Sequence, residues 1–189
     1  MRIQVVFDSK VIVAALCEIG AGALTYPGVP PLTGRDNADA LFVFAYPDDD
    51  NFAFVSSGAI IDEVVVALAR KTLLEWPFDS TDVAEVVLRN LARRSSGGQV
   101  TPTMRVNVPP RFADTTKTAL QTAATSDSLG DFPRVVVTAD PVALKLGQLQ
   151  PHGISFSRND PITFLSPLDF ARLAHRVRWK MRPSLSVRP

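Results

Sequence analysis

The sequence has few of the residues that cross-link a chain, bind soft metals or span a membrane. Its single cysteine, Cys17, excludes an internal disulfide and is typical of a reducing compartment. The two histidines, His152 and His175, lie too far apart in the sequence to indicate a metal-binding pair or an activating base. No run approaches the roughly 18 apolar residues of a membrane span. Since the N-terminus also reaches the charged Asp8 too early for a signal peptide, we expect a cytoplasmic protein without a membrane segment.

The sequence also lacks an excess of charge of either sign. The 20 basic and 19 acidic residues give a net charge of +1, so the chain as a whole is not predicted to bind polyelectrolytes. The exception is the C-terminal end, where no acid follows Asp169 and Trp179 stands among arginine and lysine residues. Such a segment either contacts RNA phosphates and stacks on a base or is a solvated chain end. We therefore separate a basic tail, residues 175–189, from a domain that spans residues 1–174.

The rest of the chain alternates between strand and helix patterns within a single domain. A hydrophobic content of 46% is enough for one sizeable core. A glycine- and proline-rich stretch, about residues 18–35, is predicted to be an inserted loop. Strands are expected at residues 3–7, 52–55, 134–138 and 162–165, and helices at residues 11–16, 36–45, 59–70, about 80–91, 114–126, 142–149 and 167–174. Strands interleaved with helices predict a three-layer α/β/α fold with a central parallel sheet.

Acidic side chains follow two of the expected strands. Asp8 comes directly after the run Ile3–Phe7, and Asp140 follows the run Arg134–Thr138. Glu63 lies in the first turns of the helix after the strand at residues 52–55. Because the carboxyl ends of parallel strands meet at one rim of a sheet, we expect these acids to lie near one another. Carboxylates gathered at one point repel each other unless a cation lies among them, so the pattern indicates a divalent-metal site.

Some of these acids also have an ordinary structural explanation. Asp140 precedes Pro141, which favours the first helical position, so Asp140 fits a helix N-cap. Glu63 has an equally available acidic neighbour in Asp62. Asp114 is most simply explained as the N-cap of the helix that it precedes. A cap and a metal ligand can be the same residue, so these explanations do not exclude the metal site.

Four segments carry a resemblance to a known family: Val5–Leu16, Val55–Val64, Val135–Leu144 and Ile162–Phe170. In this order they resemble PIN-domain nucleases, which include the toxins of many prokaryotic toxin–antitoxin pairs. The resemblance covers most of the chain. It implies a PIN-like fold and an endoribonuclease that hydrolyses RNA phosphodiester bonds. It also implies an antitoxin protein and a second copy of the chain as partners to test.

The same resemblance implies Asp8, Glu63 and Asp140 as ligands of Mg²⁺ or Mn²⁺. Hard divalent ions prefer oxygen ligands, and Mg²⁺ keeps several waters when a few carboxylates hold it. A metal-bound water can attack the scissile phosphorus while the metal neutralises the charge that develops. Ser9 and Thr138, beside the strand-end aspartates, are the hydroxyl candidates for contacts to the substrate.

Two positions depart from the family pattern. Where the family usually has an asparagine, two residues after the first aspartate, this chain has Lys10. An ammonium ~6 Å from a divalent ion would cost roughly 5 kcal/mol at an effective dielectric near 20. The third acid of the family is expected shortly before Leu120, where this chain has Thr116 and Lys117. Asp114, slightly further back, is the candidate for a substitute catalytic carboxylate.

These departures leave two hypotheses open. In the first, Lys10 and Lys117 bind phosphates, and the chain is a Mg²⁺- or Mn²⁺-dependent endoribonuclease. In the second, the two ammonium groups pair with Asp8 and Asp140, and the chain is a catalytically degenerate PIN-like module that acts through protein or RNA binding. A phosphoesterase of the haloacid-dehalogenase type also has an aspartate after its first strand. That class needs a second aspartate where Lys10 stands, so we discount it.

Overall fold

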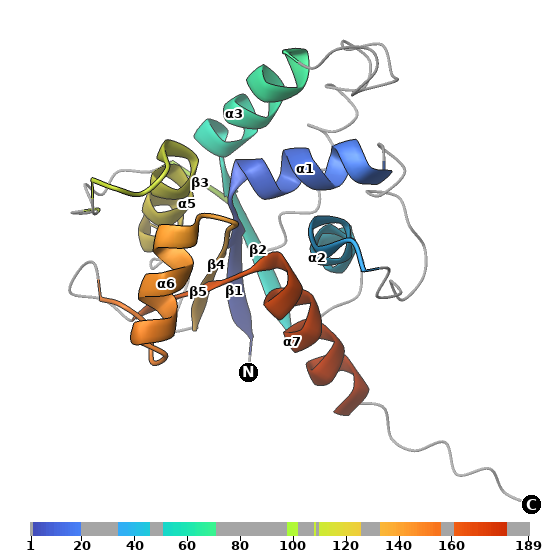
Figure 1. Ribbon diagram of the computed structural model, residues 1–189, viewed down its shortest axis with the longest axis vertical. Helices are drawn as coiled ribbons and strands as arrows, with labels where there is room; N and C mark the ends of the chain where they lie inside the picture. Colours follow the sequence, from blue (N-terminus) through green and yellow to red (C-terminus); the bar gives the residue numbers. More distant parts are fainter. Residues whose placement is uncertain are drawn as a thin grey trace, which may run out of the picture.

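The computed structural model describes residues 2–19, 34–45, 51–70, 98–101, 108, 110–125, 133–155 and 161–180 (Figure 1). Within them, the predicted three-layer α/β fold is confirmed: a five-stranded parallel sheet carries helices on both faces. Most of the inserted loop, the helix predicted at about 80–91 and the end of the basic tail lie outside the described residues. Among the helices that are described, none is long and apolar enough to cross a membrane.

The sheet has its first strand at the centre. Its strands are β1 (Ile3–Phe7), β2 (Phe52–Ser57), β3 (Gly98–Val100), β4 (Arg134–Val137) and β5 (Ile162–Leu165), in the spatial order β3-β2-β1-β4-β5. Nearly every residue of β1, β2 and β4 is buried, which explains why their sequences are continuous apolar runs. The sequence pattern does not predict β3. This strand has three residues and no apolar run, and it is defined by its pairing with β2.

Six described helices form the outer layers: α1 (Ser9–Ile19), α2 (Asp36–Ala45), α3 (Gly58–Ala69), α5 (Asp114–Thr125), α6 (Pro141–Leu149) and α7 (Pro167–Lys180). Figure 1 shows α1, α2 and α7 on one side of the sheet and α5 and α6 on the other. The predicted helix ends agree to within a few residues except at α7. This helix continues to Lys180, so the first part of the basic tail is helical.

An aromatic cluster joins α7 to the sheet. The ring of Phe170 packs edge-on against Phe7 and Phe52, with 5.5 Å between ring centroids in both pairs. Phe170 also meets Phe54 at 6.4 Å, and Phe7 stacks on Phe54 at 5.9 Å. All four side chains are buried. Aromatic pairs in these geometries stabilise a core beyond the area that they bury, so the last helix belongs to the same core as the first strand.

The strand order brings the carboxyl ends of β1, β2 and β4 to one rim of the sheet. β1 and β4 pair with Phe7 opposite Val137, so Asp8 and Thr138 follow as neighbours. The backbone N–H of Asp8 donates to the carbonyl of Val137 at 2.9 Å, which holds the two strand ends together. Helices α1, α3 and α6 all begin at this rim. It is where an open parallel sheet usually binds its ligand.

Candidate functional site

Asp8 lies at the centre of the rim and is buried, with 1% of its surface exposed. Its Oδ1 accepts the backbone N–H of Lys10 at 3.0 Å. Its Oδ2 accepts two hydroxyls, from Thr116 at 2.6 Å and from Thr138 at 2.8 Å. The carboxylate therefore accepts three hydrogen bonds from donors of its own chain.

Thr116 reaches the rim from the first turn of α5 and is fully buried. Its Oγ1 also lies 3.2 Å from the Oγ1 of Thr138. Each hydroxyl has a single proton, and both protons are directed to the same oxygen of Asp8, whose two lone pairs are thereby occupied. A donor thus stands where the resemblance to PIN-domain nucleases leads one to expect a further acid.

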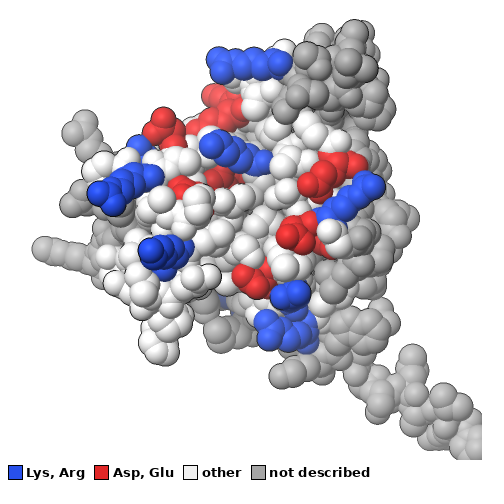
Figure 2. Space-filling view, viewed as in Figure 1, with Lys and Arg blue, Asp and Glu red and all other residues white. Residues whose placement is uncertain are grey.

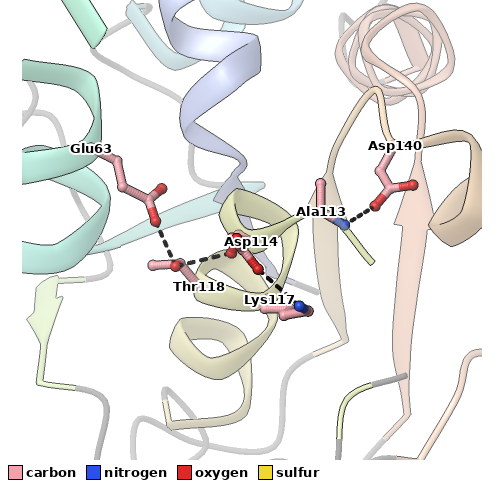
Figure 3. Close-up of polar contacts among 6 residues, drawn as sticks. All are labelled: Glu63, Ala113, Asp114, Lys117, Thr118 and Asp140. Atoms are coloured by element: carbon pink, nitrogen blue, oxygen red, sulfur yellow. Dashed lines mark hydrogen bonds and ion pairs between the residues drawn. The ribbon is translucent and has the colours of Figure 1, made fainter. Parts of the chain in front are cut away.

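Asp140 caps α6 and also anchors the segment that leads into α5. Its Oδ1 accepts the N–H groups of Val142 and Ala143 at 2.8 and 3.4 Å. Its Oδ2 accepts the N–H of Ala113 at 2.7 Å, as Figure 3 shows. The N-cap explanation for Asp140 is confirmed. The same carboxylate therefore fixes the start of one helix relative to another.

The pKa of Asp140 is lowered below its ordinary value of 3.8. Burial is the largest single influence and raises the pKa. The hydrogen bonds to the charged form lower it, and their combined effect is larger than that of burial. These hydrogen bonds come from the backbone N–H groups of Ala113, Val142 and Ala143. Asp140 is therefore ionised at neutral pH, at a position where only 9% of its surface is exposed.

Glu63 extends from α3 towards α1 and α5. Its Oε2 accepts the hydroxyl of Ser9 at 2.6 Å. Its Oε1 accepts the hydroxyl of Thr118, also at 2.6 Å (Figure 3). Its neighbour Asp62 is exposed. The rotation of α3 thus selects Glu63 rather than Asp62 as the acid that reaches the rim.

The two lysines do not take the positions expected in the degenerate hypothesis. Lys117 bonds Asp114 at 2.8 Å (Figure 3), and this hydrogen bond and charge lower the pKa of the exposed Asp114, with a smaller contribution from Lys10. The side chain of Lys10 is exposed, and its ammonium makes no hydrogen bond or ion pair with the described residues. Threonine hydroxyls, rather than ammonium groups, therefore partner Asp8.

Two hollows in the surface adjoin the rim, and Lys10 lines both of them. The first, of about 360 Å³, contains Asp8 and Asp140 together with the exposed Arg111. The second, of about 330 Å³, contains Glu63 and is otherwise mostly apolar. Figure 2 shows acidic and basic side chains interspersed on this face of the molecule. A ligand here therefore meets charges of both signs within a short distance.

Hydroxyls of α5 are the site residues that the sequence pattern identifies least well. Besides Thr118, which bonds Glu63, Thr122 donates to Oγ of Ser57 at 2.9 Å. Ser57 in turn caps α3 by accepting the N–H of Ile60 at 3.3 Å. A signal exists in the opening residues of the helix, Asp-Thr-Thr-Lys-Thr, because β-branched hydroxyl residues are weak helix formers. Threonines on a helix face that packs on a sheet indicate polar partners there.

The acids of the rim have the oxygen chemistry that Mg²⁺ and Mn²⁺ require. Within the described ranges, however, no group of three or more histidine, cysteine, aspartate or glutamate side chains is arranged to hold a metal ion. Asp8, Glu63 and Asp140 instead accept N–H and O–H donors of the chain. In this arrangement the acids do not fit a shared ion, and the Mg²⁺ or Mn²⁺ site stays a prediction.

Comparisons with protein-family models, with curated proteins and with solved structures gave no match to this chain. The chemistry of the rim therefore has to follow from its own residues.

Proposed function

We propose that this chain is a PIN-like module that binds single-stranded RNA at the rim of its sheet without cleaving it. The observation that carries the proposal is the hydrogen bond of 2.6 Å from Thr116 to Asp8. It supports the degenerate hypothesis in a changed form, with hydroxyl groups rather than ammonium groups as the partners of Asp8. A neutral hydroxyl stands where the family resemblance implies a fourth acid. A cytoplasmic location stays a prediction from the composition, and an antitoxin partner and a homodimer stay predictions of the family resemblance.

Two features of the rim oppose a divalent ion. Both lone pairs of Asp8 Oδ2 accept hydroxyls, so an ion would have to displace Thr116 or Thr138 or use only Oδ1. Lys10 lines the same hollow as Asp8 and Asp140. If its ammonium lay ~6 Å from a divalent ion, the repulsion would be on the order of 5 kcal/mol at an effective dielectric near 20. Together, these features support a rim that is stable without metal.

Two exposed cations support contact with a phosphodiester backbone. Lys10 and Arg111 both line the hollow that contains Asp8 and Asp140. Arginine and lysine supply most sequence-independent contacts to nucleic-acid phosphates. Because the two buried acids offset part of this positive charge, we expect weak, salt-dependent binding, with a dissociation constant of roughly 10⁻⁴ to 10⁻⁶ M.

The first experiment tests whether the rim has lost its metal site through two residues. We expect no heat from Mn²⁺ at millimolar concentration with the native chain in calorimetry. Lys10→Asn combined with Thr116→Asp should bind Mn²⁺ at least about a hundredfold more tightly, because a repulsion of roughly 5 kcal/mol is removed and a carboxylate is added. Lys10→Asn with Thr116→Val is the matched control, since it removes the same groups without adding an acid.

One outcome would instead support the endoribonuclease hypothesis. If the native chain binds Mn²⁺ at micromolar concentration and Asp8→Asn abolishes that binding, the hydroxyls do not exclude the ion. Cleavage of single-stranded RNA by the same preparation would then establish a Mn²⁺-dependent nuclease with Asp8, Glu63 and Asp140 as its acids.

The second experiment measures RNA binding by fluorescence anisotropy over a range of salt concentrations. Lys10→Ala with Arg111→Ala should weaken binding and lower the slope of log affinity against log salt by about 1.4, the value for two lost contacts to a single strand. Lys145→Ala with Arg70→Ala is the matched control, because both residues are exposed and neither lines the two hollows. Equal effects of the two pairs would contradict the assignment of the rim.

A further inference from the structure

The second hollow differs in chemistry from the acidic one beside it. It lies between α1 and α3, and its volume of about 330 Å³ is at the low end of the roughly 300–1,000 Å³ of small-molecule sites. Its apolar surface comes from Val13, Ala14, Cys17 and Ala67. Among the described residues that line it, the one acid is Glu63. A small apolar hollow with a single carboxylate suits a flat ligand that carries hydrogen-bond donors on one edge.

Glu63 still has acceptor capacity towards such a ligand. A carboxylate offers about four lone-pair sites, and within the described residues Glu63 uses one on each oxygen, for Ser9 and for Thr118. One acceptor site therefore remains on each of the two oxygens. These hydroxyl bonds also restrict the rotation of the carboxylate, because one comes from Ser9 in α1 and the other from Thr118 in α5.

A second polar group of the hollow lacks a partner. The hydroxyl of Thr115 is buried and makes no hydrogen bond with any described residue, although Thr115 lines the hollow. A buried polar group without a partner is uncommon in folded proteins and calls for an explanation. A ligand in the hollow could satisfy this hydroxyl after a rotation of the Thr115 side chain.

We infer that this hollow binds a nucleobase of the RNA and prefers guanine, with Glu63 as the residue that determines specificity. This inference rests on the proposed RNA binding. Guanine is the only one of the four bases with two adjacent donors, N1–H and the 2-amino group, on its Watson–Crick edge. Two parallel hydrogen bonds to the two oxygens of one carboxylate are strong and directional. The aliphatic side chains of the hollow exclude water from the base.

Lys10 can contact the phosphate of a bound nucleotide, and its charge favours a nucleotide over an arginine side chain as the ligand. It lines both hollows, so its ammonium can contact the phosphate of a nucleotide whose base occupies the second hollow. A guanidinium group from an arginine would also match the carboxylate of Glu63. Such a group is cationic and is repelled by Lys10, whereas guanine is neutral. The charge of the hollow therefore favours the nucleotide.

The test is a comparison of guanosine and inosine 5′-monophosphates, which differ only in the 2-amino group. Calorimetry with the native chain should give at least about tenfold tighter binding of the guanosine nucleotide, the usual effect of one hydrogen bond to a charged group. Glu63→Gln should abolish this difference, while Asp62→Asn, an exposed neighbour on the same helix, should preserve it. Ala67→Leu should fill the hollow and weaken both nucleotides, with Ala69→Leu, which is exposed, as its control.

The outcomes separate this inference from the proposed function. One outcome would overturn the guanine pocket and leave RNA binding in place. In it, the two nucleotides bind with equal affinity, and a uridine strand binds equally well whether it carries one guanosine or one inosine. A guanosine preference that depends on Glu63, without binding of longer RNA, would support the pocket and overturn the RNA module. Tighter binding of arginine methyl ester than of either nucleotide would also overturn the guanine pocket.

Discussion

At the scale of single residues, hydroxyl groups determine the chemistry of the rim. Each of the three acids lies near the carboxyl end of a strand, but its partners are donors of the chain itself. A threonine at position 116 can donate a hydrogen bond to Asp8, which an ionised aspartate at the same position could not do. Under the proposed function, this side chain gives the neighbouring carboxylate a neutral partner in place of a cation.

The charge of Asp140 should make stability depend on pH. A group whose folded pKa lies below 3.8 stabilises the fold above that pH and loses its contribution as the pH falls through the folded value. Asp140→Asn keeps one acceptor but loses the charge and the second set of hydrogen bonds. We expect a loss of about 1–2 kcal/mol in the free energy of unfolding at pH 7.

Urea unfolding at pH 7 and at pH 3 checks this prediction. The difference between Asp140→Asn and the native chain should be smaller at the lower pH, where protonation removes the advantage of the carboxylate. Asp62→Asn is the control, since an exposed substitution without such partners should change stability by no more than about 0.5 kcal/mol. A difference that grows as the pH falls would contradict the sign of the pKa shift.

At the scale of elements, α5 connects the separate parts of the rim. Thr116 joins it to β1 through Asp8, Thr118 joins it to α3 through Glu63, and Ala113, just before the helix, joins it to α6. Its apolar residues Ala119 and Leu120 are buried in the core. The helix therefore positions the site through polar contacts on one turn and packs on the sheet through the next.

Substitutions at two glycines, Gly147 and Gly58, test how closely α6 packs against β5. A Cβ added at Gly147 in α6 would lie 3.2 Å from Cβ and the carbonyl oxygen of Phe164 in β5. The strain of overpacking, about 1–3 kcal/mol, should exceed the gain of roughly 1 kcal/mol in helix propensity. Gly147→Ala should therefore lower the free energy of unfolding by about 1 kcal/mol.

Gly58 is the matched control, because it begins α3 and nothing lies within 4 Å of the Cβ that it would gain. Gly58→Ala should leave stability unchanged or raise it by up to about 1 kcal/mol, since alanine restricts the unfolded chain. Urea midpoints of both variants measure the difference. If Gly147→Ala proved as stable as Gly58→Ala, the approach of α6 to β5 would be looser than the structure indicates.

At the scale of the whole molecule, one aromatic cluster joins the ends of the chain. Phe7 comes from the first strand and Phe170 from the last helix, and their rings meet edge-on at 5.5 Å. Phe52 and Phe54 of β2 complete the contact. Because the C-terminal helix closes this face of the sheet, folding of the rim depends on residues more than a hundred positions away from Asp8 in the sequence.

Removal of the Phe170 ring should destabilise the entire fold. Phe170→Ala should lower the free energy of unfolding by about 3–5 kcal/mol, since the side chain is fully buried and leaves a cavity. This is a large share of the roughly 5–15 kcal/mol that stabilises a typical domain. Phe170→Leu, which keeps most of the volume, should lose clearly less. A loss below 1 kcal/mol for the alanine variant in urea unfolding would show that α7 is not part of the core.

The local sequence determined the parallel α/β sheet and the positions of Asp8 and Asp140. Continuous apolar runs mark doubly buried strands, and a residue that follows such a strand lies at its carboxyl end whatever surrounds it. The N-cap of α6 was also predictable, because a cap and its partners are close in sequence.

Only the tertiary structure decided which groups partner the acids. Thr116 and Asp8 are separated by 108 residues, and Thr118 and Glu63 by 55, so no local pattern contains these hydrogen bonds. Strand β3 likewise has too few residues to be recognised before it pairs with β2. The choice of Glu63 over Asp62 depends on how α3 rotates as it packs. Strand and helix patterns are local, whereas the partner of a buried carboxylate depends on which distant elements pack against it.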